Sequence, residues 1–95
     1  MKPCSIIIPH YNGKDILRRC LRSLLNTTPS DHEVIIVDNS SSDGSLAMLE
    51  KDFPQVHTIS NKTNLGYAGA CNVGALKSTH DYLIFLNNDT ELTNN

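Results

Sequence analysis

Short apolar runs alternate with segments of helical periodicity along this 95-residue chain, and this alternation constrains its fold more than any other feature. The runs cover residues 5–9, 33–38, 56–60 and 82–86. Apolar, β-branched runs of this length are typical of strands buried on both faces of a sheet. Between them, apolar residues recur at helical spacing over residues 16–25, 46–50 and 66–78. This order predicts βαβ units, and therefore an α/β fold with a Rossmann-like parallel sheet of about four strands and flanking helices.

The first two predicted helices carry start signals. Asn12 is expected to cap the helix over residues 16–25, with Asp15 favourably placed in its first turn. Ser40 and Asp43 have the spacing of a capping box before the second helix. Pro54 is expected to end that helix, because proline disfavours helical backbone in the residue before it.

Length and composition indicate one small domain over residues 1–95 and exclude several kinds of partner. The formal net charge of -2, without a basic run, predicts no nucleic-acid partner. No apolar run approaches the ~20 residues of a membrane span, and Met1-Lys2-Pro3 leaves no room for a signal peptide before the first strand. Cys4, Cys20 and Cys71 are widely spaced and read as reduced thiols. We therefore expect a cytoplasmic protein, free or peripheral at the inner membrane face.

Polar clusters follow the predicted strands at residues 10–12, 38–40, 61–66 and 87–89. In an open parallel sheet, ligands bind beyond the carboxyl ends of the strands. Asp38 fits a contact to a base or ribose equally well as a turn that satisfies local amides. The ring of Tyr11 could lie against a base, although packing over the sheet end is the commoner role. His10 reads as structural or solvated, because it has no partner nearby in the sequence.

Three glycines fall in the third predicted helix. Gly66 stands at its entrance, where glycine lets backbone N–H groups approach a phosphate. Gly69 and Gly74 read instead as sites of close packing between helix and sheet. The spacing is not that of a GxGxxG or P-loop motif, so these glycines alone do not identify a nucleotide site.

The segment Asn87-Asn88-Asp89 follows the last predicted strand and has two readings. Mg²⁺ and Mn²⁺ prefer oxygen ligands, and Mg²⁺ is often held by one or two carboxylates together with substrate phosphates. The alternative is an Asx-rich turn in which Thr90 caps the next element. Alone the turn is favoured, but three other polar clusters at the same sheet edge strengthen the metal reading.

Four segments in this order resemble the family 2 glycosyltransferases with the GT-A fold. They are SIIIPHYN at residues 5–12, IVDNSSSDGS at 36–45, NLGYAGACNVG at 64–74 and FLNNDT at 85–90. Each motif is loose alone, but the ordered set is specific and covers essentially the whole chain. The third and fourth are most similar to the rhamnosyltransferase-like branch. The resemblance implies that the chain is the N-terminal, nucleotide-binding half of a GT-A fold.

The resemblance also assigns roles to residues. It implies a nucleotide pocket formed by Pro9, Tyr11, Asp38, Asn64, Gly66, Asn72, Asn87 and Asn88. Asn87-Asn88-Asp89 takes the place of the family's Asp-x-Asp motif, with Asp89 as the ligand of a Mg²⁺ or Mn²⁺ cofactor. Asn87 departs from the first Asp of that motif and supplies no charge, so we expect weak metal affinity without the nucleotide.

The activity implied by the resemblance is that of an inverting glycosyltransferase in polysaccharide biosynthesis. Its donor is a nucleotide-diphosphate sugar, and its acceptor is a hydroxyl of a saccharide or lipid-linked glycan. A metal ion would act as a Lewis acid toward the leaving diphosphate, and a carboxylate would deprotonate the acceptor. That base is expected beyond Asn95, because nothing in residues 91–95 matches it. We therefore expect a fragment that is inactive alone.

Two alternatives come from other classes. In the strand order 3-2-1-4, residues 82–86 would be an unprotected apolar edge, and such edges recruit partners or aggregate. The chain would then be a non-catalytic interaction module, a small α/β domain that self-associates as a homo-oligomer. A flavodoxin- or receiver-like domain is disfavoured, because a receiver requires clustered acidic residues where this chain has His10-Tyr11-Asn12.

Overall fold

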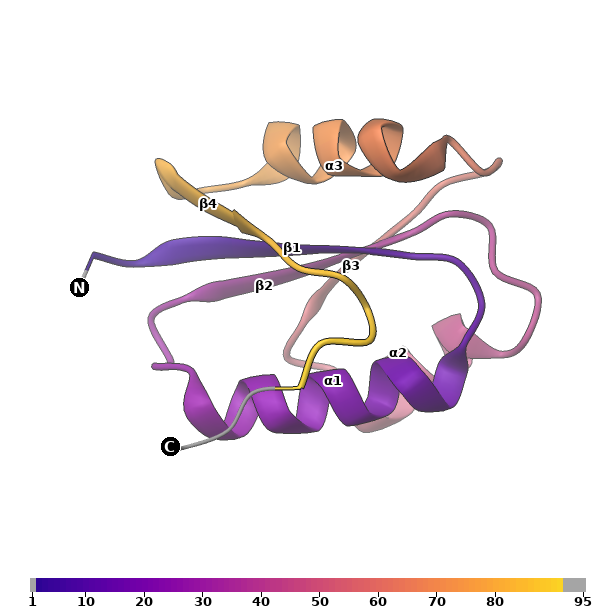
Figure 1. Ribbon diagram of the computed structural model, residues 1–95, viewed down its shortest axis with the longest axis horizontal. Helices are drawn as coiled ribbons and strands as arrows, with labels where there is room; N and C mark the ends of the chain where they lie inside the picture. Colours follow the sequence, from indigo (N-terminus) through magenta and orange to yellow (C-terminus); the bar gives the residue numbers. More distant parts are fainter. Residues whose placement is uncertain (1, 92–95) are drawn as a thin grey trace.

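Strands and helices alternate strictly in the computed structural model, which describes residues 2–91 (Figure 1). The elements are β1 (Cys4–His10), α1 (Lys14–Thr27), β2 (Glu33–Asp38), α2 (Ser45–Asp52), β3 (His57–Ser60), α3 (Gly66–Lys77) and β4 (Tyr82–Phe85). Every strand pair is parallel, and the strand order is β3-β2-β1-β4. The predicted α/β fold with a parallel sheet of four strands is confirmed, and the order is the one considered for the edge-strand alternative. Residues 92–95, on which the expectation of a missing base partly falls, lie outside the described residues.

Two apolar layers hold the helices against the sheet, with α1 and α2 on one face and α3 on the other (Figure 1). Side chains of a strand alternate between the two faces, and the core follows this alternation. Ile6, Ile8 and Ile36 pack with the buried side chains of α1 and α2. Ile7 and Ile35 pack with those of α3. The two central strands, β1 and β2, are therefore covered on both faces, as their apolar runs predict.

Close approach of α3 to the sheet depends on Gly74. A Cβ atom at this position would lie 2.5 Å from Cγ2 of Ile7, so any side chain would push the helix away. The packing role predicted for Gly74 is confirmed. The same prediction for Gly69 is wrong, because a Cβ atom there would meet the Leu65 side chain of the preceding turn, at 2.8 Å, rather than the sheet.

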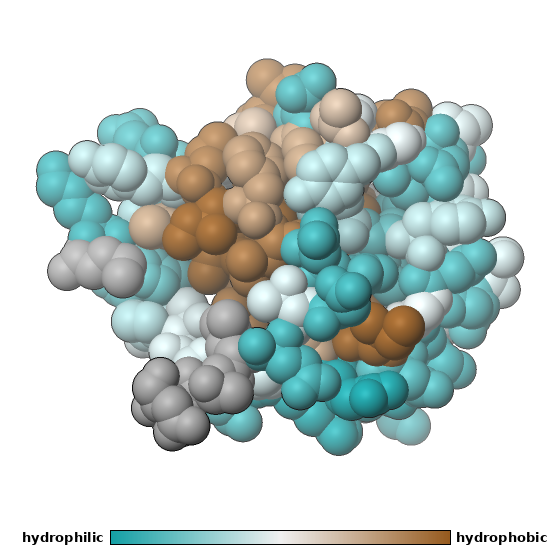
Figure 2. Space-filling view, viewed as in Figure 1, coloured by the Kyte–Doolittle hydropathy of each residue, from teal (hydrophilic) through white to brown (hydrophobic). Residues whose placement is uncertain are grey.

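The edge strands are not buried, in contrast to what their apolar runs alone suggest. Tyr82, Leu83, Ile84 and Phe85 pair with β1 on one side only and stay exposed, from 37% at Leu83 to 53% at Tyr82. Figure 2 shows apolar side chains gathered on the face where β4 runs in Figure 1. The expected unprotected apolar edge is thus present. Among the described residues, no helix is long and apolar enough to cross a membrane.

The N-terminus of α1 is capped from a distant loop, and the prediction that Asn12 caps it is wrong. Oδ2 of Asp43 accepts hydrogen bonds from the backbone N–H groups of Gly13 at 2.7 Å and Lys14 at 2.9 Å. Asn12 instead accepts a hydrogen bond from the N–H of Ser42 at 2.9 Å. Its side chain bridges two loops and is therefore not available to the helix.

The predicted capping box before α2 is also absent. Gly44 is the residue before the helix, and Oδ1 of Asp43 accepts the N–H of Ser45 at 3.1 Å. Ser40 has a φ of 68° and lies outside this arrangement. Partial burial alone would raise the pKa of Asp43, but hydrogen bonds from the Ser45 side chain and from the backbone N–H groups of Lys14, Gly13 and Ser45 outweigh it. They lower the pKa to about 2.

Replacement of Asp43 by alanine is expected to lower the free energy of unfolding by about 1–2 kcal/mol, the range of a lost helix cap. The wild-type advantage should be complete above the ordinary Asp pKa of ~3.9 and vanish as the pH falls through the folded pKa of about 2. Urea unfolding of both proteins between pH 7 and pH 2 measures it. Asp31→Ala, at an exposed position, is the control. Equal losses in the two variants would contradict the capping role.

Candidate functional site

A cavity of about 280 Å³ lies where the carboxyl ends of the strands meet. It is lined by Pro9, His10, Tyr11, Asn39, Asn64, Gly66, Tyr67 and Asn88. The lining comes from the ends of β1 and β2, the entrance to α3 and the segment after β4. Five of the eight residues predicted to contact a nucleotide are therefore together here, namely Pro9, Tyr11, Asn64, Gly66 and Asn88.

Two tyrosine rings line this cavity. Tyr11 is 52% exposed at the end of β1, and Tyr67 is 55% exposed in the first turn of α3. Exposed rings on a cavity wall offer flat apolar surfaces to a planar ligand group. Tyr67 was not among the predicted residues. Its place directly after Gly66, at a helix entrance beyond a strand, was the signal that could have found it.

Asn39, which belongs to the predicted 38–40 cluster but was given no role of its own, holds the loop that forms one side of the cavity. Its Nδ2 donates to the carbonyl of Gly66 at 3.1 Å. Its Oδ1 accepts hydrogen bonds from Nδ2 of Asn61 at 2.9 Å and from the N–H of Leu65 at 3.2 Å. Its own backbone N–H donates to the carbonyl of His10 at 2.8 Å. One buried amide thus joins the ends of β1 and β2 to the entrance of α3.

The backbone conformation of Gly66, and not an unpaired N–H group, explains why glycine is found at this position. Its φ is 76°, a backbone conformation that favours glycine. No atom lies within 4 Å of where its Cβ would be, so crowding does not explain the glycine. Its N–H, which was expected to approach a phosphate, donates instead to Oδ1 of Asn64 at 2.8 Å. This N–H is therefore already paired within the chain, and both residues line the cavity.

Asp38 lies behind the cavity rather than on its wall. The residue is 0% exposed, and its Oδ2 accepts the N–H of Ser41 at 2.9 Å. This bond matches the turn-forming reading of the sequence. Oδ1 is buried without a hydrogen-bond partner in the described part of the chain. A buried acceptor without a partner costs about 1–3 kcal/mol, so Asp38 keeps an unused capacity to accept a hydrogen bond.

His10 is buried and hydrogen-bonded on both sides of its ring. Only 1% of its surface is exposed. Its Nε2 lies 2.8 Å from Oγ of Ser45, and its Nδ1 lies 3.0 Å from Nδ2 of Asn88. Burial lowers the pKa of His10, against the nearby carboxylates of Asp38 and Asp43, which raise it. Its partners come from distant parts of the sequence, which is why the sequence did not reveal them.

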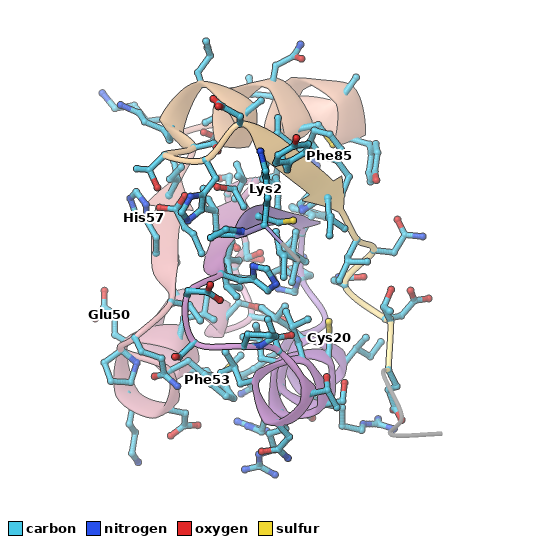
Figure 3. The ribbon with its side chains drawn as sticks, turned by 90° about the vertical axis from the view of Figure 1, so that its left-hand side faces the viewer. Lys2, Cys20, Glu50, Phe53, His57 and Phe85 are labelled. Carbon is cyan, nitrogen blue, oxygen red and sulfur yellow. The ribbon has the colours of Figure 1, made fainter. Side chains whose placement is uncertain are left out.

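The remaining predicted residues lie outside the cavity lining. Asn72 is exposed on α3, and Asn87 and Asp89 are exposed after β4. The carbonyl of Asn87 accepts the N–H of Thr90 at 3.2 Å, so the Asx-rich turn is formed. The same carbonyl accepts a weak bond from the Cys20 thiol at 3.9 Å, and Figure 3 shows this thiol on α1 directed toward the segment after β4. This contact places the turn beside α1.

The donor set fits a hard divalent cation only in part. Asp89 and the neighbouring amides offer oxygen atoms, which Mg²⁺ and Mn²⁺ prefer. Among residues 2–91, however, no group of three or more His, Cys, Asp or Glu side chains converges on a point. A single carboxylate cannot complete a coordination shell. These residues therefore suit a cation that brings further oxygen ligands with it, such as those of a diphosphate.

Comparison with known sequences identifies relatives over nearly the whole chain. The family model described as Glycosyl transferase family 2 matches residues 5–95. An uncharacterized glycosyltransferase of Haemophilus influenzae is 45% identical over 85 residues, which are 90% of this chain and 29% of that protein. A poly(ribitol-phosphate) beta-glucosyltransferase of Bacillus spizizenii is 38% identical over 91 residues, which are 90% of this chain and 14% of that protein.

Solved structures share the fold. TarS 1-349 of S. aureus in complex with UDP-GlcNAc has a TM-score of 0.82 at 27% identity, over 93% of this chain and 27% of that one. The mannosyltransferase PcManGT from Pyrobaculum calidifontis has a TM-score of 0.80 at 20% identity, over 90% of this chain and 27% of that one. The chain thus spans less than a third of each named relative. The GT-A fold is confirmed, whereas the rhamnosyltransferase-like branch stays a prediction. The chain belongs to glycosyl transferase family 2.

Proposed function

We propose that this chain forms the donor-binding part of an inverting glycosyltransferase, which transfers a sugar from a nucleotide-diphosphate donor to an acceptor hydroxyl. The carrying observation is the cavity of about 280 Å³ at the carboxyl ends of the strands, lined by two exposed tyrosine rings. This is the place where open parallel sheets bind ligands. The relative of known fold at 27% identity, TarS, is in complex with UDP-GlcNAc, which supports a uridine diphosphate sugar as the donor.

In this proposal the chain's residues bind and orient the donor. Tyr11 and Tyr67 offer their rings to the base, and Asn39 keeps the opposite loop in place through Gly66. Asp89 holds a Mg²⁺ or Mn²⁺ ion together with the donor's diphosphate. The bound cation supplies Lewis acidity toward the leaving diphosphate. We assign no base for the saccharide or lipid-linked acceptor among residues 2–91, so we expect the chain alone to bind the donor without turnover.

Replacement of Tyr11 by alanine is expected to weaken binding of uridine diphosphate about tenfold, because stacking of a base on an aromatic ring contributes about 1–3 kcal/mol. Isothermal titration calorimetry with uridine, thymidine and guanosine diphosphates plus Mn²⁺ measures this. Tyr82→Ala removes an equally exposed tyrosine from β4 and should leave the affinity unchanged. The absence of heat with all three diphosphates, in a folded sample, would count decisively against the proposal.

Asp89→Asn should abolish the effect of the cation while keeping the fold. Wild-type protein is expected to bind uridine diphosphate more tightly with Mn²⁺ than with EDTA, and to bind Mn²⁺ alone only weakly. The variant should show the same affinity under both conditions, because the only carboxylate expected to hold the ion is gone. Asp81→Asn, exposed before β4, is the matched control. If the variant still responds to Mn²⁺ like the wild type, Asp89 does not hold the metal ion.

The exposed edge strand favours a second candidate function, a non-catalytic module that self-associates. The observation that favours this candidate is the row of exposed apolar side chains along β4. The outer edge of this strand is unpaired within the described part of the chain. Light scattering should show a rise in mean mass with protein concentration. Ile84→Lys should reverse that rise, because a charge on an edge strand opposes strand pairing. A wild-type protein that remains monomeric at high concentration would rule this candidate out.

A further inference from the structure

We infer that His10 is a positioning residue: a hydrogen-bond chain from Asp43 through Ser45 and His10 fixes the amide of Asn88 so that its carbonyl oxygen faces the ligand. The inference rests on the proposed function, since it concerns how the same cavity presents Asn88 to a nucleotide donor. These hydrogen bonds join residues of three separate segments, which the sequence pattern does not connect.

Asp43 sets which group donates and which accepts in each of these hydrogen bonds. An ionised carboxylate only accepts hydrogen bonds, and the low pKa of Asp43, about 2, keeps it ionised at neutral pH. The hydroxyl of Ser45 therefore donates its single proton to Oδ1 of Asp43. Since that proton is used, Oγ of Ser45 acts as an acceptor toward its other neighbour, Nε2 of His10, at 2.8 Å.

The tautomer of His10 follows from this constraint. Nε2 must carry the proton that it donates to Ser45, and a neutral imidazole then has a bare Nδ1. A bare Nδ1 accepts, so the group of Asn88 at 3.0 Å must be the donating Nδ2. The opposite amide orientation would place Oδ1 against Nδ1, with two lone pairs facing each other. Lowering of the pKa of His10 by burial agrees with a neutral ring, although Asp38 and Asp43 oppose it.

Fixing Nδ2 against the ring directs Oδ1 of Asn88 away from His10. Asn88 lines the cavity and is partly exposed, and within residues 2–91 its Oδ1 has no hydrogen-bond partner. The site therefore offers an acceptor at this point. At Oδ1, an acceptor suits a ribose hydroxyl or a water molecule on the cation and disfavours direct contact with a phosphate oxygen. The kind of group that Oδ1 of Asn88 binds is thus set at Asp43, through the two intervening side chains of Ser45 and His10.

Burial protects this chain of hydrogen bonds from competition by water. His10 is 1% exposed and Ser45 is fully buried, so water has little access to replace a lost link. Groups that orient a ligand-binding side chain in this way typically change metal affinity by about ten- to hundredfold when they are removed. Ser45→Ala removes the acceptor for Nε2–H while it leaves His10 and Asn88 in place. It is therefore the most direct test of the connection.

The first measurement is the ¹⁵N spectrum of the His10 ring in the wild-type chain at neutral pH. The expected result is the neutral Nε2–H tautomer. Ser45→Ala should shift His10 to a mixture of tautomers and weaken binding of uridine diphosphate with Mn²⁺ about tenfold. Ser42→Ala, an exposed serine of the same loop, is the control and should alter neither readout. In an Asn88→Ala background, Ser45→Ala should cause no further loss of affinity.

Several outcomes would overturn the inference. An Nδ1–H tautomer or a protonated ring in the wild type would do so, even if the Ser45 variant failed to fold. An additive loss in the Ser45 and Asn88 double variant would mean that Ser45 acts independently of Asn88. If the Nε2–H tautomer is found but no diphosphate binds, the proposed function fails and the orientation of the amide is upheld.

Discussion

The burial of β1 between β2 and β4 is the constraint on which the rest of the structure depends. The strand pairs in parallel register along both edges and is covered by helices on both faces. Its last residues, Pro9 and His10, cannot shift without displacing this whole arrangement. Both residues line the cavity, and the ring of His10 holds Asn88. The site is thus positioned by a strand buried on both faces, whereas its other lining residues come from loops and from the entrance to α3.

The spacing of apolar residues along the sequence was enough to predict the helices and strands, their order along the chain and the sheet edge where the site forms. Parallel pairing places the carboxyl ends of all strands together, so polar clusters after β1, β2 and β4 converge by topology alone. Side-chain partners between loops could not be predicted in this way. Asp43 caps a helix that begins 29 residues earlier in the sequence. No local pattern distinguishes such a cap from the local Asn12 cap that was expected.

Asp43 shows how stability and site geometry depend on the same group. One carboxylate oxygen satisfies two N–H groups at the start of α1, and the other binds Ser45. The first contact fixes the helix that follows β1, and the second begins the hydrogen-bond chain to Asn88. A substitution here therefore changes the fold and the ligand contact together. Ser45 separates the two effects, because its hydroxyl takes part in the second contact and not in the cap of α1.

The predicted residues differ in whether a ligand could reach them without movement of neighbouring side chains. Tyr11 and Asn64 already line the cavity, so they could contact a nucleotide without rearrangement. Asp38 is fully buried, and its Oδ1 could accept from a base N–H only after neighbouring side chains moved aside. Such a movement would give Oδ1 its missing hydrogen bond and recover part of the cost of burying it unpaired. A ligand that reached Asp38 would therefore complete the hydrogen bonding of an oxygen that has no partner among residues 2–91.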